Sequence, residues 1–143
     1  MRPFVTLRLC VTCLILGVAA CAAVPPVQSD IEYRQAGGQS LKLDAWVPEG
    51  PGPFPAVILV HGGGWTFGSV DSHENEMRYL ALASGAAVVG FDYRLAPEAP
   101  FPAPLDDVLA AIADIRAGAL GADIDADRIA LAGDSAGANL ALG

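Results

Sequence analysis

Three short apolar runs, separated by segments with helical periodicity, constrain the fold of this chain more than any other feature. The runs cover residues 56–60, 86–91 and 128–132. Continuous apolar runs of this length are typical of strands that are buried on both faces of a parallel sheet. Because helical patterns fill the gaps, the order strand, helix, strand, helix, strand predicts an α/β fold with a mostly parallel sheet and right-handed crossovers.

The flanking segments add detail to this prediction. Residues 31–36 and 41–47 alternate apolar and polar side chains around a Gly-Gly pair, which predicts a hairpin of partly exposed strands. The proline-rich segment 48–55 is expected to be a loop. A helix is expected from a cap at Asp71-Ser72 to a stop at Gly85.

A second helix is expected over residues 105–112, where apolar side chains recur at helical spacing. Its first turn contains Asp106 and Asp107, at the end where the helix dipole favours negative charge. We therefore interpret this carboxylate pair as structural rather than as acid/base machinery. The side chains expected to face the sheet are Leu105, Val108, Leu109 and Ile112.

The N-terminal segment differs in kind from the rest of the chain. Arg2 and Arg8 are the only charged side chains before Asp30, and residues 9–20 are almost entirely apolar. A helix of that length spans roughly 18 Å, too short for the ~30 Å hydrocarbon core of a bilayer. A positive start followed by a short apolar stretch predicts a secretory signal peptide over residues 1–20.

The cleavage site leaves two interpretations open. Val18-Ala19-Ala20-Cys21 resembles the bacterial lipobox, in which the cysteine is lipidated and becomes the new N-terminus. The alternative is ordinary cleavage at Ala20-Cys21-Ala22. We favour lipidation of Cys21, which predicts an exported protein held in the bacterial cell envelope by a lipid anchor; the alternative predicts a secreted or periplasmic soluble protein.

This choice also settles the role of the other cysteines and the domain boundaries. Cys10 and Cys13 would be removed with the signal, so we interpret their Cys-x-x-Cys spacing as accidental. Residues 21–30 are then expected to form a tether. Residues 31–143 are expected to form the folded part.

The charge of the chain argues against nucleic-acid binding. The formal net charge is −8, and no run rich in lysine and arginine is present. Removal of Arg2 and Arg8 with the signal takes this charge from −8 to −10, because two positive charges are lost. The acidity favours solubility and says nothing about the substrate.

The segment Gly133-Asp134-Ser135-Ala136-Gly137 follows the third apolar run and opens a helical segment. This is the context of a nucleophile elbow, a tight strand-to-helix turn that exposes a serine hydroxyl. Residues two before and two after the serine must lack side chains to avoid a clash, which Gly133 and Gly137 satisfy. A helix N-terminus at Ser135 would help to stabilise an oxyanion.

A second glycine motif, His61-Gly62-Gly63-Gly64-Trp65, directly follows the first apolar run. Acyl transfer builds negative charge on the carbonyl oxygen, and backbone N–H groups must reach that oxygen without obstruction. A run of glycines allows this approach. A phosphate-binding loop would need Gly-x-Gly-x-x-Gly or a terminal Gly-Lys-Ser/Thr, and neither is present. The two motifs, placed in this order at two strand ends, therefore predict a hydrolase.

On these residues the chain resembles the hormone-sensitive-lipase-like, or GDXG, family of α/β-hydrolases. The resemblance rests on the two glycine motifs and on Asp92-Tyr93-Arg94-Leu95-Ala96-Pro97-Glu98, which is followed by Phe101-Pro102-Ala103. It covers residues 30–143. The resemblance implies the α/β-hydrolase fold, in which a mostly parallel central sheet is flanked by helices.

The same resemblance implies roles for individual residues. Ser135 would be the nucleophile, and His61 and Gly62 would shape the glycine loop without touching the substrate. No metal and no organic cofactor is implied. The oxyanion hole would be formed by the backbone N–H groups of Gly63, Gly64 and Ala136.

Other residues of these motifs have simpler expected roles. Arg94 and Glu98, on either side of Pro97, are expected to pair and hold the loop after the second apolar run. Trp65 and Phe67 would either line the pocket for the acyl or alcohol group or simply pack.

Neither histidine of the chain is expected to be the catalytic base. A serine nucleophile needs a histidine base and an orienting carboxylate. His61 belongs to the glycine loop, and His73 is expected to be solvated. In α/β-hydrolases the acid and base follow the serine in the chain, so both are expected beyond Gly143. The chain is thus expected to be the N-terminal part of an α/β-hydrolase domain, truncated after the elbow and nearly inactive alone, with an uncovered sheet edge beside the third run.

The expected function of the full-length parent is hydrolysis of carboxylic esters through an acyl-serine intermediate. The resemblance implies a preference for short chains. Its partners would be a small-molecule ester and, through Cys21, a membrane. Two alternatives stay open: a non-catalytic protein that binds small molecules on the same scaffold, as the plant gibberellin receptors do, and an inactive truncated product.

Overall fold

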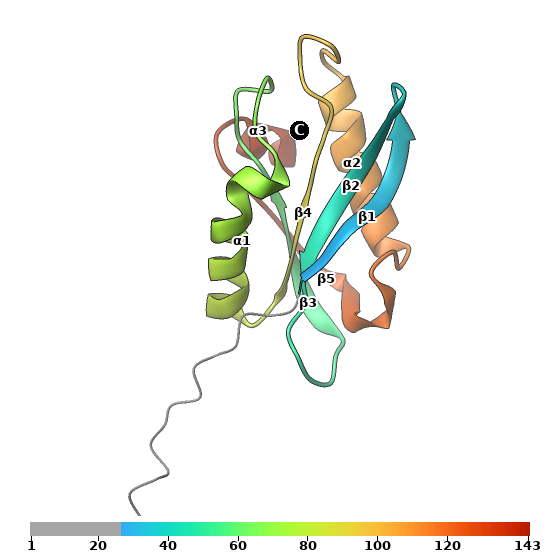
Figure 1. Cartoon of the computed structure of the whole chain (residues 1–143). Coiled ribbons are helices and arrows are strands. Elements are labelled where there is room, and N and C mark those ends of the chain that lie inside the picture. The colour runs from blue at the N-terminus through green and yellow to red at the C-terminus, as the bar shows by residue number, and fades with distance from the viewer. Residues whose placement is uncertain (1–26) are drawn as a thin grey trace, which may run out of the picture.

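The computed structural model describes residues 27–143 as a sheet with helices on both sides (Figure 1). The expected signal peptide, Cys21 and residues 21–26 of the expected tether lie outside these described residues. In chain order the elements are β1 (Val27–Ala36), β2 (Gln39–Trp46), β3 (Phe54–Val60), α1 (Val70–Ser84), β4 (Ala87–Phe91), α2 (Ala103–Arg116), the 3-10 turn η2 (Gly121–Asp123), β5 (Ile124–Gly133) and α3 (Ala136–Leu142).

The five strands form one sheet in the order β1-β2-β4-β3-β5. The hairpin strands β1 and β2 are antiparallel, and β2 is also antiparallel to β4. The strands β4, β3 and β5, which contain the three apolar runs, are parallel. The expected hairpin and mostly parallel arrangement are thus confirmed. In the β3–β5 ladder Val60 lies opposite Gly133, so the two strands end side by side.

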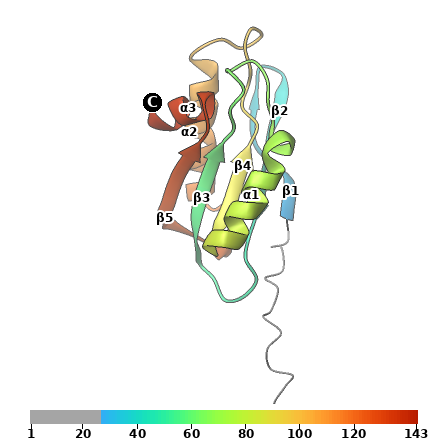
Figure 2. The ribbon, with the colours of Figure 1, turned by 90° about the vertical axis from the view of Figure 1, so that its left-hand side faces the viewer.

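Helices cover the two faces of the sheet unequally (Figures 1 and 2). Helix α1 packs on β2 and β4, whereas α2 and α3 lie on the opposite face. Two cores result, one on each side. The smaller core lies under α1 and includes Trp46, Met77 and Val88; the larger lies under α2 and α3.

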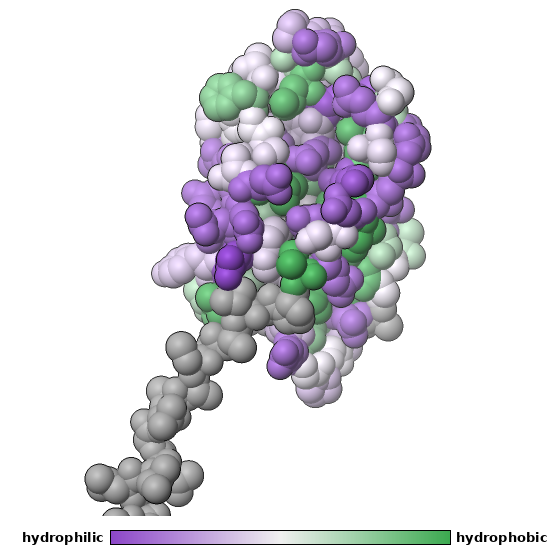
Figure 3. Space-filling model, in the orientation of Figure 1, coloured by the Kyte–Doolittle hydropathy of each residue, from purple (hydrophilic) through white to green (hydrophobic). Residues whose placement is uncertain are grey.

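The face of the molecule in Figure 3 is coloured by the hydropathy of its residues. Hydrophilic side chains cover much of the face in Figure 3, and hydrophobic ones are scattered among them. Among residues 27–143 no helix is both long enough and apolar enough to cross a bilayer.

Two boundaries differ from the expected ones. Strand β1 begins at Val27, so the last four residues assigned to the tether belong to the sheet, where Val27 lies opposite Trp46. Helix α1 begins at Val70, because Ser69 and Ser72 form its capping box: the Ser69 hydroxyl accepts the Ser72 N–H, and the Ser72 hydroxyl accepts the Ser69 N–H. The expected stop at Gly85 is confirmed by its left-handed conformation.

Strand β5 is not buried on both faces as expected. It pairs on one side only, with β3, and α1 lies over β2 and β4 instead. Leu131 is therefore 42% exposed. The expected uncovered edge beside this strand is present, and such edges promote association with other strands.

The buried face of α2 is rotated from the expected one because Asp107 points inward. The side chain of Asp107 is fully buried, whereas Leu109 is 57% exposed. Both carboxylate oxygens bind the Arg94 guanidinium at 2.8 Å, and Arg34 Nη1 lies 3.1 Å from Asp107 Oδ1. Arg94 was expected to pair with Glu98, but this prediction is wrong: Arg94 pairs with Asp107, and Glu98 is exposed. The structural role assigned to Asp107 is confirmed.

We expect Asp107→Asn to destabilise the protein by about 3 kcal/mol, because it removes one partner of a buried ion pair and leaves the Arg94 charge without compensation. Denaturant unfolding of the two proteins would measure this change. Asp106→Asn is the matched control: it changes the same charge one residue away at an exposed position and should cost less than about 1 kcal/mol. Equal losses in the two variants would contradict the role of the Arg94 pair.

Candidate active site

Ser135 lies on a sharp turn between β5 and α3. Its backbone has φ 49° and ψ −116°, a left-handed conformation that a residue with a side chain rarely adopts. A Cβ on Gly133 would lie 2.6 Å from the backbone carbon of Gly137. A Cβ on Gly137 would overlap the carbonyl oxygen of Val60. The steric reason given for both glycines is thus confirmed, and the turn holds the Ser135 hydroxyl at the surface.

The glycine loop follows β3 and folds back on itself. The carbonyl oxygen of Gly63 accepts the N–H groups of Thr66 and Phe67, both at 3.1 Å. Gly63 has φ 118°, and a Cβ there would overlap the carbonyl oxygen of Phe67. Beyond this turn, the carbonyl oxygen of Trp65 accepts the Ala96 N–H at 2.8 Å. The loop can therefore adopt this shape only with glycine at position 63.

Asp134 connects the glycine loop to the serine turn. Its Oδ1 accepts the backbone N–H of Gly62 at 2.7 Å, and a Cβ on Gly62 would overlap the carboxylate. The sequence interpretation gave Asp134 no role, because it occupies the variable position of Gly-x-Ser-x-Gly. Its place in Gly133-Asp134-Ser135-Ala136-Gly137, on which the family resemblance rests, was the only signal that could have singled it out.

Three backbone N–H groups near Ser135 have no acceptor. Within residues 27–143, no hydrogen bond uses the N–H of Gly63, Gly64 or Ala136. Gly63, Gly64 and Ser135 line one cavity of about 470 Å³. The other residues that line this cavity are Phe67, Gly68, Ser72, His73 and Asp134. The structure thus brings the expected nucleophile and the expected glycine donors to one cavity, with Ala136 next to Ser135 in the chain.

His61 is held inside the protein below the glycine loop. Its ring is 1% exposed and stacks on Tyr93 at 4.3 Å, and the Tyr93 hydroxyl donates to the His61 carbonyl oxygen at 2.8 Å. Its Nδ1 bonds to the Gly62 carbonyl oxygen at 2.8 Å, so Nδ1 carries the proton. Burial lowers the pKa of His61 below its usual 6.5 and raises the pKa of Tyr93 to about 12. Both rings are therefore neutral at pH 7 and serve to support the loop.

The lowered pKa of His61 predicts a loss of stability in acid. A group whose pKa falls on folding stabilises the protein fully above its unfolded value, here 6.5, and this contribution disappears as the pH falls through the folded value. His61→Phe retains a flat ring for Tyr93 and cannot be protonated. We expect the free energy of unfolding to fall less between pH 8 and pH 5.5 in this variant than in the wild type. Parallel denaturation curves at both pH values would measure this difference, and equal slopes would contradict it.

His73 is not the solvated side chain that was expected. It is 18% exposed, and its Nε2 lies 3.4 Å from Asp134 Oδ1. Helix α1 brings it there, since this helix begins directly after the glycine loop. Within the described residues, no hydrogen bond joins the Ser135 hydroxyl to either histidine. Neither histidine is thus placed as the base.

One set of side chains has the types that bind metals. Ligand atoms of His73, Glu76 and Asp134 all lie within 4.8 Å of one another. Glu76 and Asp134 are exposed, and His73 already has Asp134 as a partner. We interpret this set as a cluster of polar side chains and not as a metal site.

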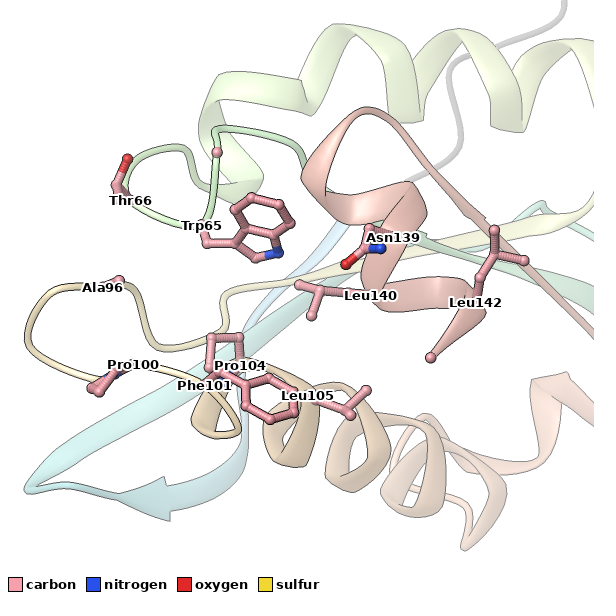
Figure 4. Close-up of a pocket in the computed structure, with 12 residues that line it drawn as sticks. Trp65, Thr66, Ala96, Pro100, Phe101, Pro104, Leu105, Asn139, Leu140 and Leu142 are labelled. Atoms are coloured by element: carbon pink, nitrogen blue, oxygen red, sulfur yellow. The ribbon is translucent and has the colours of Figure 1, made fainter.

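A second, apolar cavity of about 600 Å³ is lined in part by Gly64 and Trp65 of the glycine loop (Figure 4). Gly64 belongs to both cavities. Trp65 forms one wall, Phe101 and Leu105 form another, and Leu140 from α3 lies between them, with Leu142 to the right (Figure 4). Trp65 thus lines this apolar cavity, whereas Phe67 lines the one that contains Ser135.

Fold, motifs and geometry together define the class of this protein. Residues 57–143 match the family described as alpha/beta hydrolase fold. The match covers more than half of the chain, and the chain therefore belongs to this family, in its hormone-sensitive-lipase-like (GDXG) group.

Individual relatives agree with this assignment. The chain is 45% identical to carboxylesterase NlhH of Mycobacterium tuberculosis over 95 residues, which are 66% of this chain and 30% of the relative. It is 36% identical to carboxylic ester hydrolase LipN of the same organism over 132 residues, 85% of this chain and 34% of the relative. The crystal structure of EstE1, a thermostable carboxylesterase from a metagenomic library, superposes with a TM-score of 0.75 at 39% identity, over 82% of this chain and 40% of EstE1. The chain thus spans less than half the length of these relatives.

Proposed function

We propose that the full-length protein hydrolyses carboxylic esters through an acyl intermediate on Ser135. The observation that carries this proposal is the cavity in which an exposed serine on a strained turn lies beside glycines with unpaired N–H groups. The relatives named carboxylesterase and carboxylic ester hydrolase support the same reaction.

The proposed reaction has two halves. The Ser135 oxygen attacks the ester carbonyl carbon and gives up its proton, and the carbonyl oxygen becomes an oxyanion that accepts the N–H groups of Gly63, Gly64 and Ala136. The C–O bond to the alcohol breaks, the alcohol leaves with a proton, and the acyl group remains on Ser135. Water then attacks the acyl carbon and releases the acid and the free serine. The histidine base and its carboxylate would be supplied by residues outside 27–143.

We propose further that the apolar cavity beside Gly64 receives the apolar part of the ester. Its walls carry aromatic, proline and leucine side chains, and burial of apolar surface stabilises a bound chain by about 25 cal/mol per Å². The small polar contribution of Asn139 at its edge does not change this character.

A fluorophosphonate probe tests the nucleophile directly. The protein expressed from the complete reading frame should react once, and mass spectrometry of its peptides should place the phosphonyl group on Ser135. Short p-nitrophenyl esters should be turned over by the same preparation. Absence of both labelling and turnover would favour the binding-protein alternative.

The location of the protein is a separate proposal. We propose that residues 1–20 are removed, that Cys21 is lipidated and that the protein is exported to the cell envelope on a lipid anchor. The order of the arginines, the apolar run and the lipobox-like Val18-Ala19-Ala20-Cys21 supports this. Mass spectrometry of the mature N-terminus would show a lipidated Cys21 if it holds, and an unmodified start at Ala23 would indicate simple secretion.

A further inference from the structure

His73 contacts the carboxylate that fixes the glycine loop. Asp134 Oδ1 accepts the Gly62 N–H at 2.7 Å and lies 3.4 Å from His73 Nε2. The imidazole, the carboxylate and the backbone N–H therefore form a continuous chain of polar contacts from α1 to the loop. Gly62 is followed directly by Gly63 and Gly64, whose N–H groups have no acceptor among residues 27–143.

The first turn of α1 holds the His73 ring in this orientation. Its Nδ1 lies 2.9 Å from the Ser72 hydroxyl oxygen and 3.3 Å from the Ser69 carbonyl oxygen. The Ser72 hydroxyl can donate to Nδ1, and in this tautomer the ring proton lies on Nε2, which faces Asp134. The capping box that starts the helix thus also orients the histidine.

The Asp134 side chain depends on His73 for a second contact besides its hydrogen bond to Gly62. Its side chain is 49% exposed, and the Gly62 N–H is a single hydrogen bond. The Glu76 carboxylate lies within 4.8 Å of the cluster and repels a second negative charge. Without His73, the Asp134 side chain can rotate into solvent and leave Gly62 without its acceptor.

We propose that His73 is a positioning residue for the oxyanion hole: acting through Asp134 and Gly62, it holds the N–H groups of Gly63 and Gly64 toward the cavity of Ser135. This inference rests on the proposed function. The oxyanion exists in the transition state and not in the bound ester, so loss of alignment lowers kcat and leaves KM nearly unchanged. Loss of one oxyanion donor lowers kcat by about 10²-fold to 10³-fold in known hydrolases, and partial misalignment should lower it by roughly 10-fold to 100-fold.

Three variants of the protein from the complete reading frame test this role. His73→Leu removes the contact to Asp134. His73→Gln restores a side-chain N–H of similar reach. Glu74→Gln is the matched control, because it removes a charge at the position next to His73, where the exposed Glu74 carboxylate pairs with Arg78 and not with Asp134. For each variant, kcat and KM with p-nitrophenyl acetate, the unfolding midpoint and amide hydrogen exchange of the peptide that contains residues 61–67 are measured.

The expected result has two parts. In His73→Leu, kcat falls by roughly 10-fold to 100-fold at unchanged KM and unfolding midpoint, and hydrogen exchange in the loop accelerates. His73→Gln recovers most of the lost kcat and most of the protection from exchange, and Glu74→Gln behaves as the wild type.

Several outcomes would overturn the role of His73 or the function on which it rests. Wild-type kcat and exchange in His73→Leu would show that Asp134 holds the loop alone. An equal loss in His73→Gln, or a loss of kcat that follows the folded fraction, would show that His73 only supports the fold. Absence of turnover in the wild-type protein would remove the proposed function itself, whereas unchanged loop exchange would remove the positioning role independently of turnover.

Discussion

Replacement of Ser135 by alanine should abolish turnover of short p-nitrophenyl esters by the protein from the complete reading frame. Removal of the nucleophile in serine hydrolases lowers kcat on the order of 10⁴-fold or more, and the rate that remains comes from binding and the oxyanion hole. The fold should be unaffected, because Ser135 is exposed and its hydroxyl makes no hydrogen bond within residues 27–143. Stopped assays and denaturant unfolding on one preparation measure both quantities.

A second substitution at the same position separates chemistry from strain. Ser135 has φ 49°, and a non-glycine residue held in such a conformation costs on the order of 1–3 kcal/mol. Ser135→Ala retains this strain, whereas Ser135→Gly relieves it. We therefore expect Ser135→Gly to be as inactive as Ser135→Ala. Its free energy of unfolding should exceed that of Ser135→Ala by about 1 kcal/mol. A stable and inactive glycine variant would show that the turn is strained for the sake of the exposed hydroxyl.

The control for both variants is Ser84→Ala, at an exposed position near the end of α1, far along the chain from the serine turn. It should retain wild-type kcat. Undiminished turnover in Ser135→Ala would contradict the mechanism. A glycine variant that is less stable than the wild type would contradict the strain argument alone.

The fold was predictable because its signals are local. A strand buried in a parallel sheet must be apolar throughout, and the runs at 56–60 and 86–91 have this property. The prediction of the buried face of α2 was wrong because a contact between residues distant in the chain determines that face. Helix α2 turns Asp107 inward because Arg94, 13 residues earlier, binds its carboxylate, and this rotation exposes Leu109.

In the candidate site, too, the residues with local roles were predictable and those that depend on distant contacts were not. The roles of Gly133 and Gly137 follow from the steric demands of a tight turn, which act over a few residues. Asp134 and His73 depend on partners that the fold brings together: Gly62 lies 72 positions before Asp134 in the chain. No periodicity or spacing records such a contact, so His73 could be expected only as one more polar residue near the start of a helix.

Gly137→Ala should prevent the protein from reaching a stable fold. The added methyl group would overlap the carbonyl oxygen of Val60 and lie 2.6 Å from that of His61. Both atoms belong to the backbone where β3 ends, in the interior of the sheet, and cannot move aside as a side chain could. We expect a loss of at least about 3 kcal/mol, at the upper end for a single substitution. Circular dichroism and denaturant unfolding of the purified variant measure it.

Gly85→Ala is the matched control for this prediction. Its Cβ would meet nothing within 4 Å, but its φ of 66° is left-handed, so the variant measures conformational cost without a clash, about 1 kcal/mol. If Gly137→Ala loses no more than Gly85→Ala, the close contact between α3 and β3 is not the constraint that fixes position 137. If it loses more, as expected, the missing side chain of Gly137 is what lets the start of α3 rest on the end of β3. That contact sets how close Ser135 comes to Gly63 and Gly64, so the same glycine governs both the stability of the sheet and the geometry of the proposed oxyanion hole.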